Sequence, residues 1–159
     1  MNRTAQALAD ELGERLRARG LTLAAAESFT AGGVCAAVAA AAGASDYFLE
    51  GLVCYRDEVK AGRLGVSFET LRTHTAVSAE TAAEMVGGIQ ALSGAALCVA
   101  TTGYAGRDGA PRPEDGLFYI ATALNGDVKV GRYVVSGTRR EVTEAGVLQA
   151  LSALLERLT

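Results

Sequence analysis

The fold is decided by residues 95–135, which read AALCVATTGYAGRDGAPRPEDGLFYIATALNGDVKVGRYVV. The first six residues form an unbroken apolar run, which is typical of a strand buried on both faces. Further on, residues 117–124 and 128–135 flank Asn125-Gly126, a dipeptide that strongly favours a β-hairpin turn. The stretch therefore predicts a buried strand, a loop that contains glycine and proline, and an antiparallel hairpin.

Ahead of that stretch, short apolar runs alternate with segments of helical periodicity. Strands that alternate with helices before a hairpin predict an α/β domain, with a mixed sheet that includes the C-terminal hairpin and with helices on both faces. The expected strands cover residues 21–26 and 48–55. The expected helices cover residues 4–19, 31–42, 57–64, 68–73, 78–92 and 140–158.

The composition of the 159 residues is that of a folded domain with an acidic surface. Half of the residues are hydrophobic and 21% are charged, which rules out a disordered chain. The net charge is −3 and no basic run is present, so the chain lacks the cationic surface that binding to nucleic acid requires. With five tyrosines, four phenylalanines and no tryptophan, it also offers few rings for base stacking.

Cysteine and histidine usage argues against disulfides and metals. Cys35, Cys54 and Cys98 are odd in number and each lies in an apolar run, which favours buried reduced thiols. Because His74 is the single histidine, a structural zinc site is not expected.

The sequence shows no export signal and no membrane span. Acidic residues at positions 10, 11 and 14 occupy the region where a signal peptide is apolar. The most apolar stretch, residues 31–44, is shorter than the roughly 20 residues that span a bilayer. We therefore expect a cytoplasmic protein that does not contact membranes.

Three segments follow expected strands and so are candidates for a functional site. They are residues 27–33, 55–60 and 101–109. In open α/β sheets, ligands bind beyond the carboxyl ends of the strands, because the loops that leave several strands meet there.

Ser28 is the candidate nucleophile. It lies where a strand turns into a helix rich in small residues, so its hydroxyl is expected near unpaired backbone N–H groups that stabilise an oxyanion. The alternative is that Ser28 or Thr30 only caps the helix.

Lys60 is the candidate base. Arg56 and Arg63 lie within one helical turn of it, and like charge together with desolvation favours the neutral amine. A neutral lysine can accept the proton of a serine, with Tyr55 assisting. The alternatives are a solvated lysine and a tyrosine that packs on the edge of the sheet.

The loop over residues 102–109 is the candidate ligand-binding segment. Its three glycines allow close approach of the backbone, and successive N–H groups can form an anion nest. A flexible surface loop is the alternative, and no Gly-Lys-Ser/Thr follows that would make it a Walker loop.

His74 is a possible general base or a plain loop residue. No spacing of acidic residues favours catalysis by a pair of carboxylates. The arginines that could hold a phosphate are Arg107, Arg112, Arg139 and Arg140.

Four short segments carry a resemblance to a known family. They are AESFTAG (26–32), YRDEVK (55–60), HTAVS (74–78) and TGYAG (102–106). In this order and approximate spacing they resemble the CinA C-terminal domain family, which includes the nicotinamide mononucleotide deamidases. The resemblance covers about residues 5–156, so residues 1–159 are expected to form a single CinA C-terminal-like domain.

The resemblance implies a three-layer α/β/α sandwich that hydrolyses an amide without a metal or a cofactor. Active members convert nicotinamide mononucleotide to nicotinic acid mononucleotide and ammonia. By this likeness, Ser28 is the nucleophile, Lys60 is the catalytic lysine and Tyr55 is the tyrosine of its motif. The ligand-binding residues expected from the two loops and the arginines are Thr30, Ala31, Gly32, Thr102, Gly103, Ala105, Gly106, Arg107 and Arg139.

The sequence departs from the family's pattern mainly around the ligand. The departures are Phe29 for a cysteine or small residue, Asp57 for an asparagine, Arg107 for a proline, the acidic pair Glu114-Asp115 for a segment with a basic residue, and Thr143 for an arginine. They motivate a second hypothesis beside the amidohydrolase, a catalytically impaired module that binds a ligand or a partner protein. The amidohydrolase hypothesis implies a small-molecule substrate, and the alanine-rich helices favour a homo-oligomer.

Overall fold

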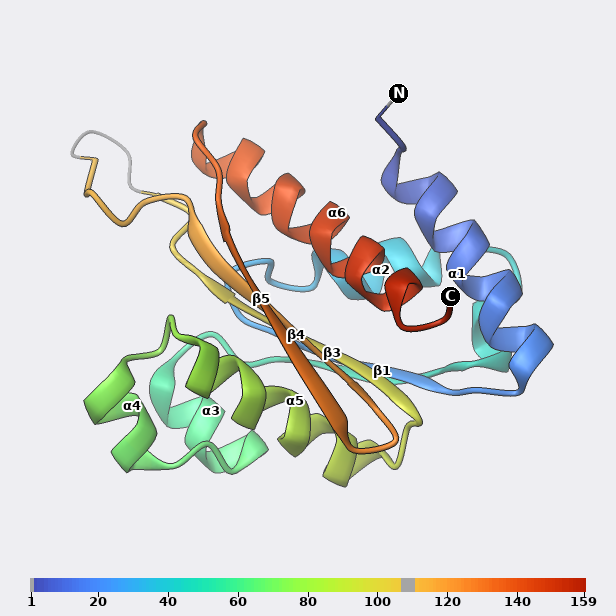
Figure 1. Ribbon diagram of the computed structural model, residues 1–159, viewed down its shortest axis with the longest axis horizontal. Coiled ribbons are helices and arrows are strands. Elements are labelled where there is room, and N and C mark those ends of the chain that lie inside the picture. The colour runs from blue at the N-terminus through green and yellow to red at the C-terminus, as the bar shows by residue number, and fades with distance from the viewer. Residues whose placement is uncertain (1, 107–110) are drawn as a thin grey trace.

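The computed structural model describes residues 2–106 and 111–159, and it shows a five-stranded sheet between two layers of helices (Figure 1). The strands are β1 (Leu23–Glu27), β2 (Phe48–Val53), β3 (Leu97–Gly103), β4 (Leu117–Leu124) and β5 (Asp127–Val134). The helices are α1 (Ala5–Arg19), α2 (Gly33–Ala39), η1 (Ala44–Asp46, a 3₁₀ turn), α3 (Asp57–Leu64), α4 (Phe68–His74), α5 (Ala79–Ser93) and α6 (Arg139–Glu156).

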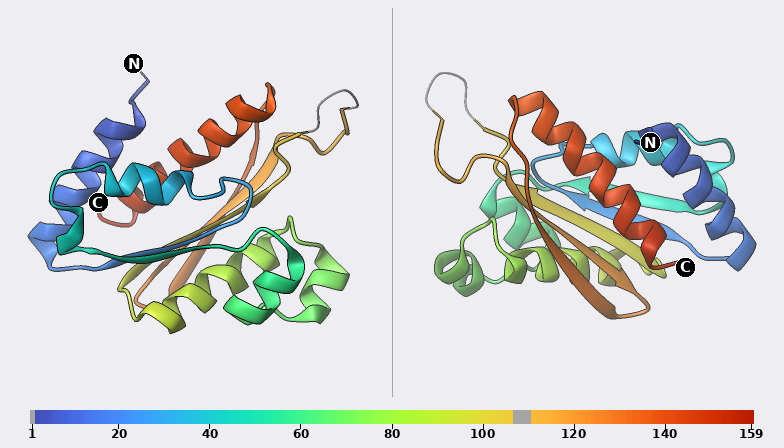
Figure 2. Two further views of the ribbon diagram at one scale, coloured as in Figure 1. Left: turned by 180° about the vertical axis from the view of Figure 1, so that it is seen from behind. Right: turned by 45° about the horizontal axis from the view of Figure 1, so that its top comes forward.

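The order of the strands in the sheet is β2-β1-β3-β4-β5. β1 pairs in parallel with β2 and β3, whereas β4 pairs antiparallel with β3 and β5. Helices α1, α2 and α6 cover one face, and α3, α4 and α5 cover the other (Figure 2). The predicted three-layer α/β/α sandwich with a mixed sheet is confirmed.

The two faces of the sheet bury separate hydrophobic clusters, as the period of two along a strand requires. On β3, Leu97 and Val99 belong to the cluster under α1, α2 and α6, whereas Cys98 and Ala100 belong to the cluster under α5. All five residues of β1 are buried. Because the central strands are covered on both faces, their sequences are almost continuously apolar rather than alternating.

The hairpin forms at the predicted dipeptide. Asn125 and Gly126 both have positive φ angles, 49° and 89°, as a type I′ turn requires. Leu124 pairs with Asp127 directly beside the turn. The turn fixes which residues of β4 and β5 pair with each other. Successive side chains of β4 then point to opposite faces of the sheet, where the helices bury most of them.

Helix α2 is shorter than the sequence predicted. It covers Gly33–Ala39 rather than residues 31–42, because Ala31 and Gly32 have positive φ angles that a helix cannot contain. The alanine-rich sequence favours helix on both sides of these boundaries, so it does not indicate the residues at which α2 begins and ends. None of the helices in residues 2–106 and 111–159 is long and apolar enough to cross a membrane.

The unusual Phe29 is accommodated by a glycine in α6. The Phe29 ring is buried and lies 5.2 Å from the ring of Phe118, centroid to centroid. A Cβ added at Gly146 would lie 2.7 Å from Cε2 of Phe29 and nearer still to Cζ. The phenylalanine next to Ser28 therefore depends on the absence of a side chain at Gly146.

We predict that Gly146→Ala lowers the free energy of unfolding by about 1–3 kcal/mol, because the new methyl group overpacks the Phe29 ring. The matched control is Gly87→Ala in α5, where an added Cβ has no atom within 4 Å. Removing glycine there is expected to stabilise the helix by about 0.5–1 kcal/mol. Urea unfolding measures both, and a change of the same sign in the two variants would refute the packing argument.

Candidate active site

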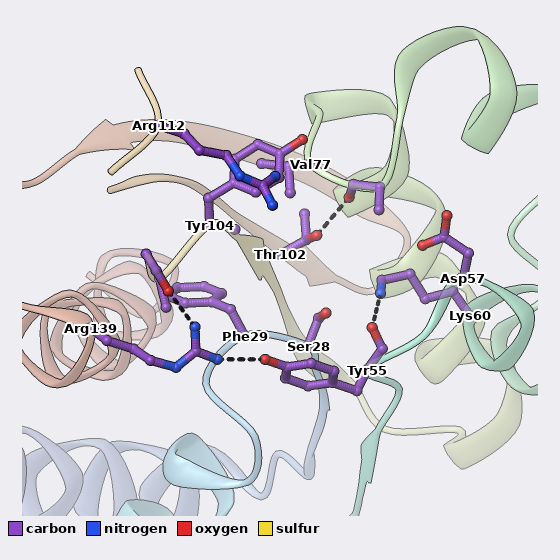
Figure 3. Close-up of a pocket in the computed structure, with 14 residues that line it drawn as sticks. Ser28, Phe29, Tyr55, Asp57, Lys60, Val77, Thr102, Tyr104, Arg112 and Arg139 are labelled. Atoms are coloured by element: carbon purple, nitrogen blue, oxygen red, sulfur yellow. Dashed lines mark hydrogen bonds between the residues drawn. The ribbon is translucent and has the colours of Figure 1, made fainter. Parts of the chain in front are cut away.

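A cavity of about 230 Å³ opens at the edge of the sheet where β1 and β3 end (Figure 3). Residues from all three segments singled out in the sequence meet there, together with the start of α6. The lining residues are Ser28, Phe29, Tyr55, Asp57, Lys60, Ala76, Val77, Thr102, Gly103, Tyr104, Ala105, Gly106, Arg112 and Arg139.

Ser28 is the first residue after β1, and its backbone is fixed by β3. The Ser28 N–H donates to the backbone oxygen of Thr101 at 3.0 Å and to its Oγ1 at 3.2 Å. The side chain is 6% exposed and points into the cavity (Figure 3). Within the described part of the chain, the Ser28 hydroxyl has no hydrogen-bond partner, so it remains available to a ligand.

The start of α2 is capped by Glu27 and not by Ser28 or Thr30. The buried Glu27 carboxylate accepts hydrogen bonds from the N–H groups of Val34 and Cys35, both at 2.9 Å. It also accepts one from the Thr30 hydroxyl at 2.6 Å. The capping interpretation of Ser28 is therefore wrong, and the N–H groups at this helix end are already paired with a carboxylate.

We predict that Glu27→Gln destabilises the protein by about 2–3 kcal/mol, because an amide cannot accept from three donors as a carboxylate does. Chemical denaturation measures the loss. Glu58→Gln is the matched control, since this exposed carboxylate pairs with Arg56 on the surface and its loss should change stability by less than about 0.5 kcal/mol. Equal effects of the two substitutions would contradict the capping role of Glu27.

Lys60 is almost completely buried, with 1% of its surface exposed, although it lies on the short helix α3. Its Nζ donates to the backbone oxygen of Tyr55 at 2.8 Å. Burial lowers the pKa of the Lys60 amine below its ordinary value, and this effect outweighs the opposing charges of Asp57 and Glu58.

Two causes of a neutral Lys60 were predicted from the sequence, repulsion from Arg56 and Arg63 and desolvation. Neither arginine contributes to the lowered pKa of Lys60, whereas desolvation is its largest cause. Arg56 instead forms an ion pair with Glu58 at 3.1 Å on the surface. Desolvation is therefore the force that favours the neutral amine.

Tyr55 and Arg139 join two sides of the cavity rim. Tyr55 is half exposed, and its hydroxyl accepts a hydrogen bond from Arg139 Nη2 at 2.8 Å. Arg139 Nη1 donates to the backbone oxygen of Gly106 at 2.6 Å. Tyr55 thus contacts Lys60 through its backbone oxygen, while its hydroxyl is held by the arginine.

The predicted ligand-binding residues fall into two groups. Thr102, Gly103, Ala105, Gly106 and Arg139 line the cavity. A second group, Thr30, Ala31 and Gly32, is not among the lining residues, and Arg107 lies outside the described residues.

Thr30 and Ala31 do not line the cavity because the Thr30 hydroxyl and the Ala31 N–H are engaged within the turn that leads into α2. The Thr30 hydroxyl contacts Glu27 and Thr101, and the N–H of Ala31 donates to the Ser28 oxygen at 3.0 Å. Of the N–H groups that follow Ser28, those of Phe29, Thr30 and Gly32 have no acceptor in the part of the chain that the structure describes, so they are the remaining local candidates for holding an oxyanion.

His74 is not part of this site. It ends α4, where its Nδ1 lies 3.7 Å from Glu80 Oε2, and it does not line the cavity. Residues 2–106 and 111–159 contain no group of three or more His, Cys, Asp or Glu side chains that could hold a metal ion. The three cysteines are free thiols, with Cys54 and Cys98 buried and Cys35 half-buried.

The fold and the site together define a class of protein, a three-layer α/β/α domain with a buried serine and a buried lysine in one cavity at the carboxyl edge of its parallel strands. The chain belongs to the CinA C-terminal domain family, whose model matches residues 5–158. A CinA-like protein of Citrifermentans bemidjiense is 41% identical over 146 residues, which are 91% of this chain and 35% of that protein.

Solved structures of the same family share the fold over nearly the whole chain. A competence-damaged protein (CinA) superfamily protein from Enterobacter cloacae has a TM-score of 0.94 at 34% identity and covers 100% of this chain and 95% of that one. The competence damage-inducible protein A from Klebsiella pneumoniae has a TM-score of 0.91 at 37% identity and covers 98% of each chain. The chain spans about a third of the length of the curated relatives that it matches.

Proposed function

We propose that this domain is an amidohydrolase that converts nicotinamide mononucleotide to nicotinic acid mononucleotide and ammonia. One observation carries the proposal: the Ser28 hydroxyl, which no described residue pairs with, and the buried amine of Lys60 open into the same small cavity. A serine needs a base to become a nucleophile, and a desolvated lysine is such a base.

In the first half of the reaction, Ser28 Oγ attacks the carbon of the carboxamide. Neutral Lys60 accepts the serine proton, and the negative charge forms on the amide oxygen. The resulting ammonium of Lys60 then protonates the leaving nitrogen, the C–N bond breaks, and ammonia departs. Ser28 is left as an ester of the acyl group.

In the second half, a water molecule replaces the ammonia. Lys60, neutral again, accepts a proton from the water while the water oxygen attacks the ester carbon. The C–O bond to Ser28 breaks, Lys60 returns a proton to Ser28 Oγ, and the acid leaves as a carboxylate after losing its proton to solvent. The backbone oxygen of Tyr55 keeps the Lys60 amine in place through both halves.

The size of the cavity favours a small amide head. Its volume of about 230 Å³ is below the roughly 300–1,000 Å³ that encloses a drug-sized ligand. A carboxamide on a single ring fits inside, while the remainder of a mononucleotide extends past the rim. Arg139 lies on that rim and would bind the phosphate, exchanging the Tyr55 hydroxyl for a stronger anionic acceptor.

The test is release of ammonia by the purified wild-type protein. We expect turnover of nicotinamide mononucleotide and slower turnover of nicotinamide riboside, because the riboside lacks the phosphate that Arg139 binds. Simultaneous detection of nicotinic acid mononucleotide shows that the amide is the bond cleaved. No ammonia from either compound would reject the proposed reaction.

One observation favours the alternative of a binding module. Lys60 Nζ donates to the oxygen of Tyr55, and no hydrogen bond joins it to Ser28 among residues 2–106 and 111–159. A domain that only binds would be stabilised by the mononucleotide in a thermal-shift assay without releasing ammonia. Turnover excludes a purely binding role.

A further inference from the structure

The cavity carries two opposite charges that form no ion pair within the described part of the chain. Asp57 lines the cavity at the start of α3 and forms no ion pair there, since its neighbours Arg56 and Glu58 pair with each other. Arg139 lies on the opposite side, and its two hydrogen bonds to described residues go to neutral oxygens, those of Tyr55 and Gly106. Figure 3 shows Asp57 beside Lys60 and Arg139 across the cavity from them.

The other charged groups of the lining do not cancel this polarity. Arg112 has Glu114 3.8 Å from its Nη1, and its backbone N–H donates to Asp115 at 2.8 Å. Lys60 is buried, and burial lowers its pKa, so its positive charge is disfavoured. Asp57 therefore supplies a carboxylate on the side of the cavity that holds Ser28 and Lys60.

We propose that Asp57 is a specificity-determining residue that makes the cavity favour an uncharged or cationic amide head over the carboxylate that hydrolysis produces. The inference rests on the proposed function, because it places the reacting amide beside Ser28. Substrate and product differ there by one group, a neutral carboxamide against an anion. Repulsion between the product carboxylate and the Asp57 carboxylate weakens product binding without weakening substrate binding, and so speeds product release.

Asp57 is solvent-exposed, so the repulsion is screened and the expected effect is moderate. We expect Asp57→Asn to strengthen binding of the acid relative to the amide by about 3- to 10-fold, which is within the range of a screened interaction between two unit charges. Asparagine retains the shape of the side chain and removes only its charge, so the packing of α3 is preserved.

The experiment measures dissociation constants of nicotinamide mononucleotide and nicotinic acid mononucleotide by calorimetry in a Ser28→Ala background, which prevents turnover. The measured quantity is the ratio of the two constants, compared with and without Asp57→Asn. The matched control is Glu58→Gln, which removes a neighbouring carboxylate that does not line the cavity. Ammonia release by the wild-type protein is measured separately.

A ratio that shifts towards the acid with Asp57→Asn but not with Glu58→Gln supports the proposal, even if the wild-type protein releases no ammonia and the proposed reaction fails. An unchanged ratio, or an equal shift in both variants, overturns the role of Asp57 while leaving measured deamidation intact. Failure of both nucleotides to bind at millimolar concentration overturns it as well.

Discussion

Replacement of Ser28 by alanine is expected to reduce ammonia release from nicotinamide mononucleotide by about 10³-fold or more, since loss of a nucleophile removes the covalent route entirely. The Ser28 hydroxyl has no hydrogen-bond partner in residues 2–106 and 111–159, so its removal leaves no buried polar group unpaired. The variant should therefore fold normally and still bind the mononucleotide. A continuous ammonia assay measures the rate, and calorimetry measures the retained affinity.

The control for this variant is Ser67→Ala. Ser67 caps α4 through a hydrogen bond from the N–H of Thr70 at 3.0 Å and does not line the cavity. Its loss should cost about 1 kcal/mol of stability and leave the rate unchanged. A Ser28→Ala protein that retains more than a tenth of the wild-type rate would show that this serine is not the nucleophile.

Replacement of Lys60 by methionine is expected to lower kcat by about 10²- to 10⁴-fold with little change in KM, because a general base acts in the transition state. Methionine fills nearly the same buried space and has no N–H group that must be paired with the Tyr55 oxygen. Burial of the amine is unfavourable, so the variant should be at least as stable as the wild type. Steady-state kinetics and urea unfolding measure the two effects.

Two further variants separate loss of the base from loss of a charge. Lys60→Arg retains a cation that cannot lose its proton, and it should be as inactive as Lys60→Met. Lys129→Met, on the exposed strand β5, removes a lysine away from the site and should leave kcat unchanged. Substantial activity of Lys60→Arg would contradict the role of Lys60 as a base.

The sequence was sufficient for the fold where local chemistry and burial agree. The Asn125-Gly126 turn can be placed from two residues because the turn requires two positive φ angles. The continuous apolar run of β3 could be recognised because both faces of that strand are covered. The ends of α2 could not be placed, since alanine favours helix on either side of the true boundaries.

The three segments that form the site could be predicted from the order of strands and loops in the sequence. The hydrogen-bond partners of their side chains could not be predicted. Ser28 and Lys60 share a cavity because loops after parallel strands meet at one edge. The capping role of Glu27 was missed because it depends on N–H groups seven and eight residues further along the chain. The available signal was an acidic residue at the end of an otherwise apolar strand, directly before the turn into α2. Likewise, the contact of the Tyr55 hydroxyl with Arg139 joins residues that are far apart in sequence.

The most direct test of the account is the titration of the Lys60 amine, followed by NMR of its ¹³Cε signal in the wild-type protein. Burial disfavours the ammonium, so the midpoint should lie below the ordinary lysine value of about 10.4. The base is the deprotonated amine, so ammonia release should rise with increasing pH through that same midpoint. A midpoint at or above the ordinary value, together with full activity near pH 7, would contradict activation of Ser28 by a neutral Lys60.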